Sequence, residues 1–185
     1  LNPSTRLYYV EVEEPDMHNP SGDLERLINA LETQWNLENL QADFNIIPQM
    51  QQILRKGNWT VTCAVHHADT GIDPQIVHLW PGLYEGTIYG MAVDLGSTTI
   101  AAHLCDLRTG DVVASSGQMN PQIRFGEDLM SRVSYAMMNP GGDKEMTRAV
   151  REGMDALFTQ ISADAEIDKT LIMDAVFVCN PVMHH

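Results

Sequence analysis

The stretch Gly90-Met91-Ala92-Val93-Asp94-Leu95-Gly96-Ser97-Thr98-Thr99-Ile100 decides how the second half of this 185-residue chain is interpreted. A short apolar strand runs into Asp94, a glycine turn with hydroxyl side chains follows, and a second strand leaves it. Such a turn suits nucleotide phosphates, because a glycine lets backbone N–H groups approach phosphate oxygens closely. Asp94, at the end of its strand, is placed to hold the Mg²⁺ of ATP through water. A polar β-hairpin without any ligand is the alternative.

The pattern around this hairpin predicts an α/β unit over residues 88–185. The expected order is β-β-β-α-α-β. Strands are expected at 89–93, 99–106, 112–116 and 175–179, and helices from about 127 and from about 143. Asp143 is the expected N-cap of the longer helix. Residues 175–179 are apolar throughout, which is typical of a buried strand. The glycine motifs of dinucleotide and P-loop sites are absent from the sequence.

Residues 1–87 predict a smaller α+β domain. Strands are expected at 7–12, 59–66 and 76–80, and helices at 24–35 and from Pro48 onward. Ser21 is the expected N-cap of the first helix. In 59–66, apolar residues alternate with more polar ones, which predicts a half-buried strand. The pattern changes over 83–88, where we expect the domain boundary.

Composition limits the possible partners and compartments. The formal net charge is −14, which argues against nucleic acid and against anionic membrane as partners. No apolar run approaches the roughly 20 residues of a membrane span, and no signal peptide is visible. We therefore expect a cytoplasmic protein. The chain lacks an initiator Met and stops just after a strand-like run, so we interpret it as a fragment of a longer polypeptide.

The sulfur-containing residues predict core packing rather than metal chemistry. Cys63, Cys105 and Cys179 lie far apart in apolar runs and are expected to be buried free thiols. Without a Cys-x-x-Cys pair, the chain cannot by itself hold an iron–sulfur cluster. Most of the 11 methionines fall at apolar helix positions and are expected in the core.

Three stretches together resemble one family. Residues 94–99 resemble the first phosphate motif of the ATPase superfamily of acetate and sugar kinases, heat-shock chaperones and actin. Residues 120–128 and 178–185 resemble stretches of the reductive activators of corrinoid-dependent methyltransferases, and residues 20–27 and 57–62 resemble the middle domain of those activators. Cys179 stands where that family usually has a glycine.

The resemblance implies a fold and a function. Residues 1–87 would be the middle α+β domain, and residues 88–185 the first part of a ribonuclease-H-like ATPase domain of the actin and sugar-kinase type. The full protein would carry a [2Fe–2S] ferredoxin domain ahead of this chain and would use ATP to restore cob(I)alamin from cob(II)alamin on a corrinoid protein. It is a possible homodimer. The second half of the nucleotide cleft would lie beyond residue 185, so the fragment alone is expected to be inactive.

The same resemblance implies roles for individual residues. Asp94 would hold Mg²⁺ through water, and the phosphates would be contacted by Gly96, Ser97, Thr98 and Thr99. A second group of cofactor-binding candidates comprises Asn120, Gln122, Glu127, Asp128 and Asn180. Glu127 and Asp128 open a helix, where acidic residues also stabilise the N-terminus without any ligand. His184 and His185 form either a metal-binding pair or an ordinary surface pair.

Two other functions fit parts of the sequence. A small-molecule kinase of the same superfamily would need a catalytic acid or base and a substrate pocket, neither of which is identified here. A non-catalytic docking or dimerisation scaffold would bind no nucleotide. Cysteines at C-x₄-C-x₂-C…C spacing ahead of this chain would distinguish the redox activator from the kinase.

Overall fold

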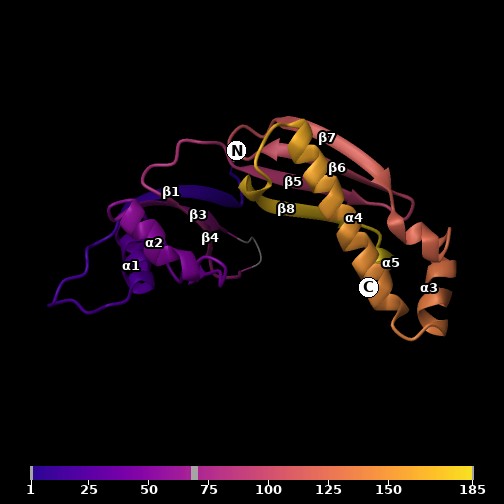
Figure 1. Cartoon of the computed structure of the whole chain (residues 1–185), viewed down its shortest axis with the longest axis horizontal. Coiled ribbons are helices and arrows are strands. Elements are labelled where there is room, and N and C mark those ends of the chain that lie inside the picture. Colours follow the sequence, from indigo (N-terminus) through magenta and orange to yellow (C-terminus); the bar gives the residue numbers. More distant parts are fainter. Residues whose placement is uncertain (1, 68–70, 185) are drawn as a thin grey trace. The chain divides into compact units, whose positions relative to one another are not determined.

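The protein consists of two compact units, residues 1–87 and 88–185. Figure 1 shows the computed structural model, which describes residues 2–67 and 71–184. Each unit has its own four-stranded sheet and its own apolar core. In the described residues, no helix combines the length and the apolar character needed to cross a membrane.

The first unit is an α+β domain with strand order β1-β3-β4-β2. Its strands are β1 (Thr5–Glu11), β2 (Gln41–Ala42), β3 (Thr60–His66) and β4 (Gln75–Pro81), and its helices are α1 (Asp23–Trp35) and α2 (Ile47–Lys56). β3 pairs antiparallel with β1 and β4, whereas β2 is parallel to β4. Both helices contribute to one core, in which Leu27, Leu31 and Leu54 are fully buried.

Strand β3 is more deeply buried than its alternating pattern predicts. All five residues from Val61 to Val65 are buried, so both faces of β3 are covered. Thr62 tolerates this position because its hydroxyl donates to the Gly82 carbonyl at 2.8 Å and accepts from the Tyr84 N–H at 2.9 Å. The prediction of a half-buried strand was therefore wrong at Thr62 and Ala64.

The second unit contains a mixed sheet with strand order β7-β6-β5-β8. Its strands are β5 (Tyr89–Leu95), β6 (Thr99–Asp106), β7 (Val112–Met119) and β8 (Ile172–Cys179). β5, β6 and β7 form an antiparallel meander, and β8 returns parallel to β5. The remaining elements are η1 (Pro121–Phe125), α3 (Leu129–Met138), α4 (Gly142–Asp164), η2 (Lys169–Leu171) and α5 (Pro181–His184).

Helix α4 covers one face of this sheet (Figure 1). Alternate residues of β5 and β6 pack against it, as expected for strands with one buried face. The core comprises Met91, Val93, Leu95, Ile100, Ala102, Leu104, Val150, Leu157 and Ile161. On the other face of β5 and β6, Ala92, Asp94 and His103 are exposed, whereas Ala101 and Cys105 are half-buried.

Strand β8 differs from the sequence prediction. It forms the edge of the sheet, and its apolar residues Val176, Phe177 and Val178 are 60%, 47% and 65% exposed. The expectation of a buried strand was wrong for this chain, because no element of the described residues pairs with its outer edge. The cysteines also differ from the prediction: Cys105 and Cys179 are only half-buried, whereas Cys63 is buried as expected, and desolvation raises the pKa of its thiol to about 12.

Two predicted helix caps and several methionines also differ. Gly22 rather than Ser21 precedes α1, and Gly141 rather than Asp143 precedes α4. Gly141 adopts a φ of 87°, a conformation that glycine reaches without strain. Most methionines were expected in the core at apolar helix positions, but the three on α3, Met130, Met137 and Met138, are exposed instead.

Candidate phosphate-binding site

Strand register brings the predicted site residues to one end of the second sheet. Leu95, the last residue of β5, pairs with Ile100 on β6 and with Cys179 on β8. Because β5 and β8 are parallel, the segments that follow them, residues 96–98 and Asn180, lie at the same edge. Thr99 pairs with Met119, which places residue 120 there as well. In open sheets with parallel strands, ligands bind at this carboxyl edge.

The turn itself is tightly closed. The Gly96 N–H donates to the Thr99 carbonyl at 3.0 Å. A Cβ at position 96 would lie 2.6 Å from that same carbonyl oxygen, so only glycine fits without a shift of the backbone. Gly96 is therefore required by the hairpin, and its N–H is not free to reach a phosphate as the sequence interpretation supposed.

The next two amides are in a different situation. Within residues 2–67 and 71–184, the backbone N–H groups of Ser97 and Thr98 have no hydrogen-bond partner. Ser97 is half-buried, and Thr98 and Thr99 are exposed. The turn therefore offers two amides and three hydroxyls to a ligand, the donor set that phosphate oxygens accept.

Asp94 projects from the sheet face opposite α4 and is exposed. No group of three or more His, Cys, Asp or Glu that could hold a metal occurs among the described residues. Mg²⁺ in nucleotide sites is commonly held by one or two carboxylates together with the phosphates themselves. One carboxylate beside the turn fits a metal that arrives with a nucleotide, rather than a site formed beforehand.

Asn120 supports the turn rather than facing a ligand. Its side chain is buried, Nδ2 donates to the Gly96 carbonyl at 2.8 Å, and Oδ1 accepts from the Gln122 N–H at 2.9 Å. Its backbone N–H donates to the Thr98 carbonyl at 2.8 Å. Gln122 in turn donates from Nε2 to the Met146 carbonyl at 3.2 Å, which fastens η1 to α4.

The remaining polar candidates are helix caps or exposed. Asp128 caps α3 by accepting from the Ser131 N–H at 2.7 Å, and this hydrogen bond lowers the pKa of the Asp128 carboxyl. Asn180 caps α5 by accepting from the Val182 N–H at 3.0 Å. Glu127 is exposed. His185 lies outside the described residues, as does the His184 side chain, so the proposed histidine pair is not described.

Arg132 belongs to this site but was missed from the sequence. It lies on α3 and is only 4% exposed. Its Nη2 donates to the Ser97 carbonyl at 2.6 Å, its Nε donates to the Gly126 carbonyl at 2.8 Å, and Nη1 lies 4.0 Å from the Met183 sulfur. Burial lowers the pKa of this guanidinium, which Asp128 partly opposes. The sequence did contain a sign of this role: Arg132 is the only positively charged residue between Leu129 and Ala136, and it lies on the helix face predicted to point inward.

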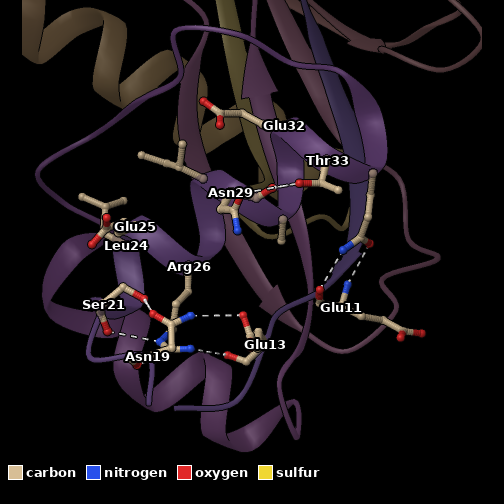
Figure 2. A pocket seen from close by; sticks show the side chains of 14 residues that line it. Glu11, Glu13, Asn19, Ser21, Leu24, Glu25, Arg26, Asn29, Glu32 and Thr33 are labelled. Carbon is tan, nitrogen blue, oxygen red and sulfur yellow. Dashed lines mark hydrogen bonds between the residues drawn. The ribbon is translucent and has the colours of Figure 1, made fainter. Parts of the chain in front are cut away.

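A separate hollow of about 800 Å³ lies in the first unit, between α1 and the segment that precedes it (Figure 2). Its lining includes Glu11, Glu13, Glu25 and Glu32. The Arg26 guanidinium there donates to four backbone carbonyls: those of Glu13, Glu14, Asn19 and Ser21. An acidic lining repels phosphate, and none of the predicted site residues lies in this hollow.

The fold and the site define a mixed α/β protein of two units, whose second sheet presents a glycine turn with hydroxyl side chains at its carboxyl edge. A family profile described as the RACo linker region matches residues 1–86, and one described as the RACo middle region matches residues 89–185. The chain belongs to this family. The term "middle" thus falls on the second unit, whereas the sequence analysis applied it to the first.

Two known proteins are similar to this chain. The corrinoid activation enzyme RamQ of Eubacterium limosum is 34% identical over 101 residues, which are 55% of this chain and 17% of RamQ. A solved structure described as a reductive activator for corrinoid, iron-sulfur protein matches all of this chain with a TM-score of 0.82 and 31% identity. The chain spans 29% of that solved chain. The expected resemblance to corrinoid reductive activators is confirmed.

Proposed function

We propose that this chain is part of an ATP-dependent reductive activator that returns cob(II)alamin to cob(I)alamin on a corrinoid protein. Membership of the family and the likeness to both corrinoid activators support this assignment. The observation that carries the nucleotide part is the convergence of residues 96–98, 120 and 180 at the carboxyl edge of β5 and β8. At this edge, the Ser97 and Thr98 N–H groups have no partner among the described residues and are available to a ligand.

In this proposal, residues 88–185 form the first part of a ribonuclease-H-like ATPase domain. A three-stranded meander, a helix across one face and a strand returning parallel to the first are the features that support it. Residues 1–87 then form the domain between this ATPase part and the electron-carrying part. Half of a cleft orients a nucleotide poorly, so the isolated chain is expected to show no ATPase activity.

The residues at the turn fit Mg²⁺ and a triphosphate. Asp94 would bind the metal through water, and the amides of Ser97 and Thr98, with the hydroxyls of residues 97–99, would bind phosphate oxygens. When bound, ATP supplies free energy that hydrolysis makes available for the release of the corrinoid protein. The chain's own contribution is to hold the phosphates in a fixed orientation.

A [2Fe–2S] cluster does not fit this chain. Cys63 lies in the first unit, Cys105 and Cys179 lie in the second, and no metal-binding group of three residues is found in the part of the chain that the structure describes. Plant-type clusters need four cysteine thiolates. In this proposal, the one electron that converts Co(II) to Co(I) comes from an iron–sulfur centre in another part of the longer protein, which is oxidised by one electron in the same step.

The test is ATP-dependent reduction of a corrinoid protein by the longer protein, followed by the absorbance change from cob(II)alamin to cob(I)alamin. We expect Asp94→Asn to lower the ATP-dependent rate at least tenfold, since the metal loses the carboxylate proposed to bind it through water. Asp111→Asn is the matched control, because Asp111 is an exposed aspartate in the turn at the other end of β6. An equal rate in the two variants would contradict the proposed role of Asp94.

A further inference from the structure

Arg132 is a buried cation whose three nitrogens each have one partner, one of which is a weakly accepting thioether sulfur. A guanidinium carries five N–H donors. In the described residues, those of Arg132 reach two carbonyl oxygens and, at 4.0 Å, one thioether sulfur. No carboxylate lies within ion-pair distance of it there. The nearest acidic group acting on it is the carboxylate of Asp128, which is exposed and beyond ion-pair distance. Burying a charge that has no close ion pair is costly, so a structural role alone explains this arrangement poorly.

The contacts of Arg132 and Asn120 fix the orientation of two peptide planes. In a planar trans peptide, the C=O and the N–H point in opposite directions. Asn120 Nδ2 holds the Gly96 carbonyl at 2.8 Å, so the Ser97 N–H points away from Asn120. Arg132 Nη2 holds the Ser97 carbonyl at 2.6 Å, so the Thr98 N–H points away from Arg132. Both amides that lack partners are therefore oriented by a buried side chain behind them.

The two side chains differ in what they add to this geometry. The amide of Asn120 is neutral and has hydrogen-bond partners on both of its polar atoms. The guanidinium of Arg132 adds a positive charge that polarises the Ser97–Thr98 peptide, because hydrogen bonds in series strengthen one another. The same charge acts directly on an anion at the turn, since buried charges are screened weakly.

We propose that Arg132 is a positioning residue for the phosphates of a nucleoside triphosphate, which turns the Thr98 N–H outward and places a positive charge behind it. The inference rests on the proposed function, because it assumes that the turn binds phosphate. Arg132 touches the turn from its carbonyl side and does not contact the phosphates.

The experiment compares Arg132→Gln, Arg132→Lys and Arg148→Gln in the longer protein, with Mg-ATP and adenosine as the titrated ligands in calorimetry. Arg148→Gln removes the same charge from an exposed position of α4 and is the matched control. We expect Arg132→Gln to weaken ATP binding roughly tenfold to a hundredfold, the equivalent of one hydrogen bond to a charged group. Adenosine binding should be unchanged, and Arg132→Lys should fall between wild type and Arg132→Gln.

The outcomes distinguish a failure of the proposed role of Arg132 from a failure of the proposed function. Equal ATP affinity in Arg132→Gln and wild type would overturn the role of Arg132 while leaving the proposed function intact. An equal loss for ATP and adenosine would indicate general damage to the domain and would also overturn it. If Arg132→Gln does not fold, an ATP affinity of Arg132→Lys equal to that of the wild type would overturn the role of Arg132. If the wild-type protein binds adenosine but gains no affinity from the phosphates of ATP, the proposed function itself fails.

Discussion

Arg26 and Arg132 are both buried arginines that hold a loop to a helix, but their partners differ. Arg26 is 3% exposed and donates to four backbone carbonyls between residues 13 and 21 (Figure 2). Arg132 is 4% exposed and donates to two carbonyls and a distant thioether. The loop that Arg26 holds surrounds its guanidinium, whereas the loop that Arg132 holds leaves two amides facing outward.

This difference separates a structural cation from one that serves a ligand. Each nitrogen of the Arg26 guanidinium donates to at least one backbone carbonyl, and these hydrogen bonds account for its burial. The charge of Arg132 has fewer carbonyl partners than that of Arg26, and Arg132 donates to the turn that the sequence predicts to bind phosphate. Removing Arg26 should therefore affect stability most, and removing Arg132 should affect ligand binding most.

The largest expected effect is that of Arg26→Gln on the first unit. Loss of hydrogen bonds between a charged group and four carbonyls should lower the free energy of unfolding by about 3 kcal/mol. All three tryptophans, Trp35, Trp59 and Trp80, belong to the first unit, so their fluorescence during urea unfolding reports this unit alone. Arg132→Gln is the control and should leave that transition in place. A loss below 1 kcal/mol in Arg26→Gln would mean that the two arginines do not differ in this way.

A smaller effect is expected for Gly96→Ala in the second unit. The added Cβ would meet the Thr99 carbonyl oxygen at 2.6 Å, so the hairpin must shift, at a cost of about 1–3 kcal/mol. Faster hydrogen exchange of the β5 and β6 amides is the measurement. Gly22→Ala is the control, because no atom lies within 4 Å of a Cβ at that position. Unchanged protection in Gly96→Ala would contradict the tight closure of the turn.

Asp128→Ala should cost about 1 kcal/mol, the usual contribution of an N-cap side chain. The carboxylate accepts from the Ser131 N–H at the start of α3, the helix that carries Arg132. Asp128→Asn retains an acceptor at the cap and should be close to wild type. Hydrogen exchange of the α3 amides distinguishes the two variants. If both lost the same protection, the carboxylate would have a role other than capping.

The two units should also respond differently to mild acid. Burial lowers the pKa of His67, assisted by Arg6 and His66, and burial lowers the pKa of His78. The fold thus favours the neutral imidazoles, and the first unit loses stability as pH falls below the usual histidine value of 6.5. In the second unit, Asp128 has a lowered pKa, so its contribution is lost only as pH falls below the usual carboxyl value of 3.8.

Urea unfolding at pH 7.5 and pH 5.5 tests this difference. The tryptophan transition of the first unit should move to lower urea, by a modest amount, while hydrogen exchange in β5 and β6 changes less. A shift of the tryptophan transition to higher urea at pH 5.5 would show that the sign assigned to the histidines is wrong.

Local patterns were sufficient to predict much of the fold. The strands expected at 89–93, 99–106 and 112–116 are confirmed, as is the helix whose apolar positions run from Leu24 to Leu31. In these elements, the residues that determine the structure are close in sequence. The two-residue strand β2 was not predicted, because its only support is pairing with β4, more than thirty residues away.

The site was harder to predict because its contacts join residues far apart in the sequence. The sequence placed Asp94 and the hydroxyl residues at a turn, but it did not show that the Gly96 N–H is used within the hairpin. Nor did it show that Asn120 lies behind the turn, or that Arg132, 35 residues away from Ser97, does. The exposure of β8 depends on what pairs with its edge, and no pattern within the strand itself reports that.

The most direct test of the central claim is hydrogen exchange at the Ser97 and Thr98 amides of the longer protein, with and without Mg-ATP. Without nucleotide, both amides should exchange rapidly, because neither has a partner among the described residues. Bound phosphates should slow their exchange at least tenfold, and Asp94→Asn should reduce that protection. Unchanged exchange at both amides under saturating Mg-ATP would contradict the claim that this turn binds the phosphates.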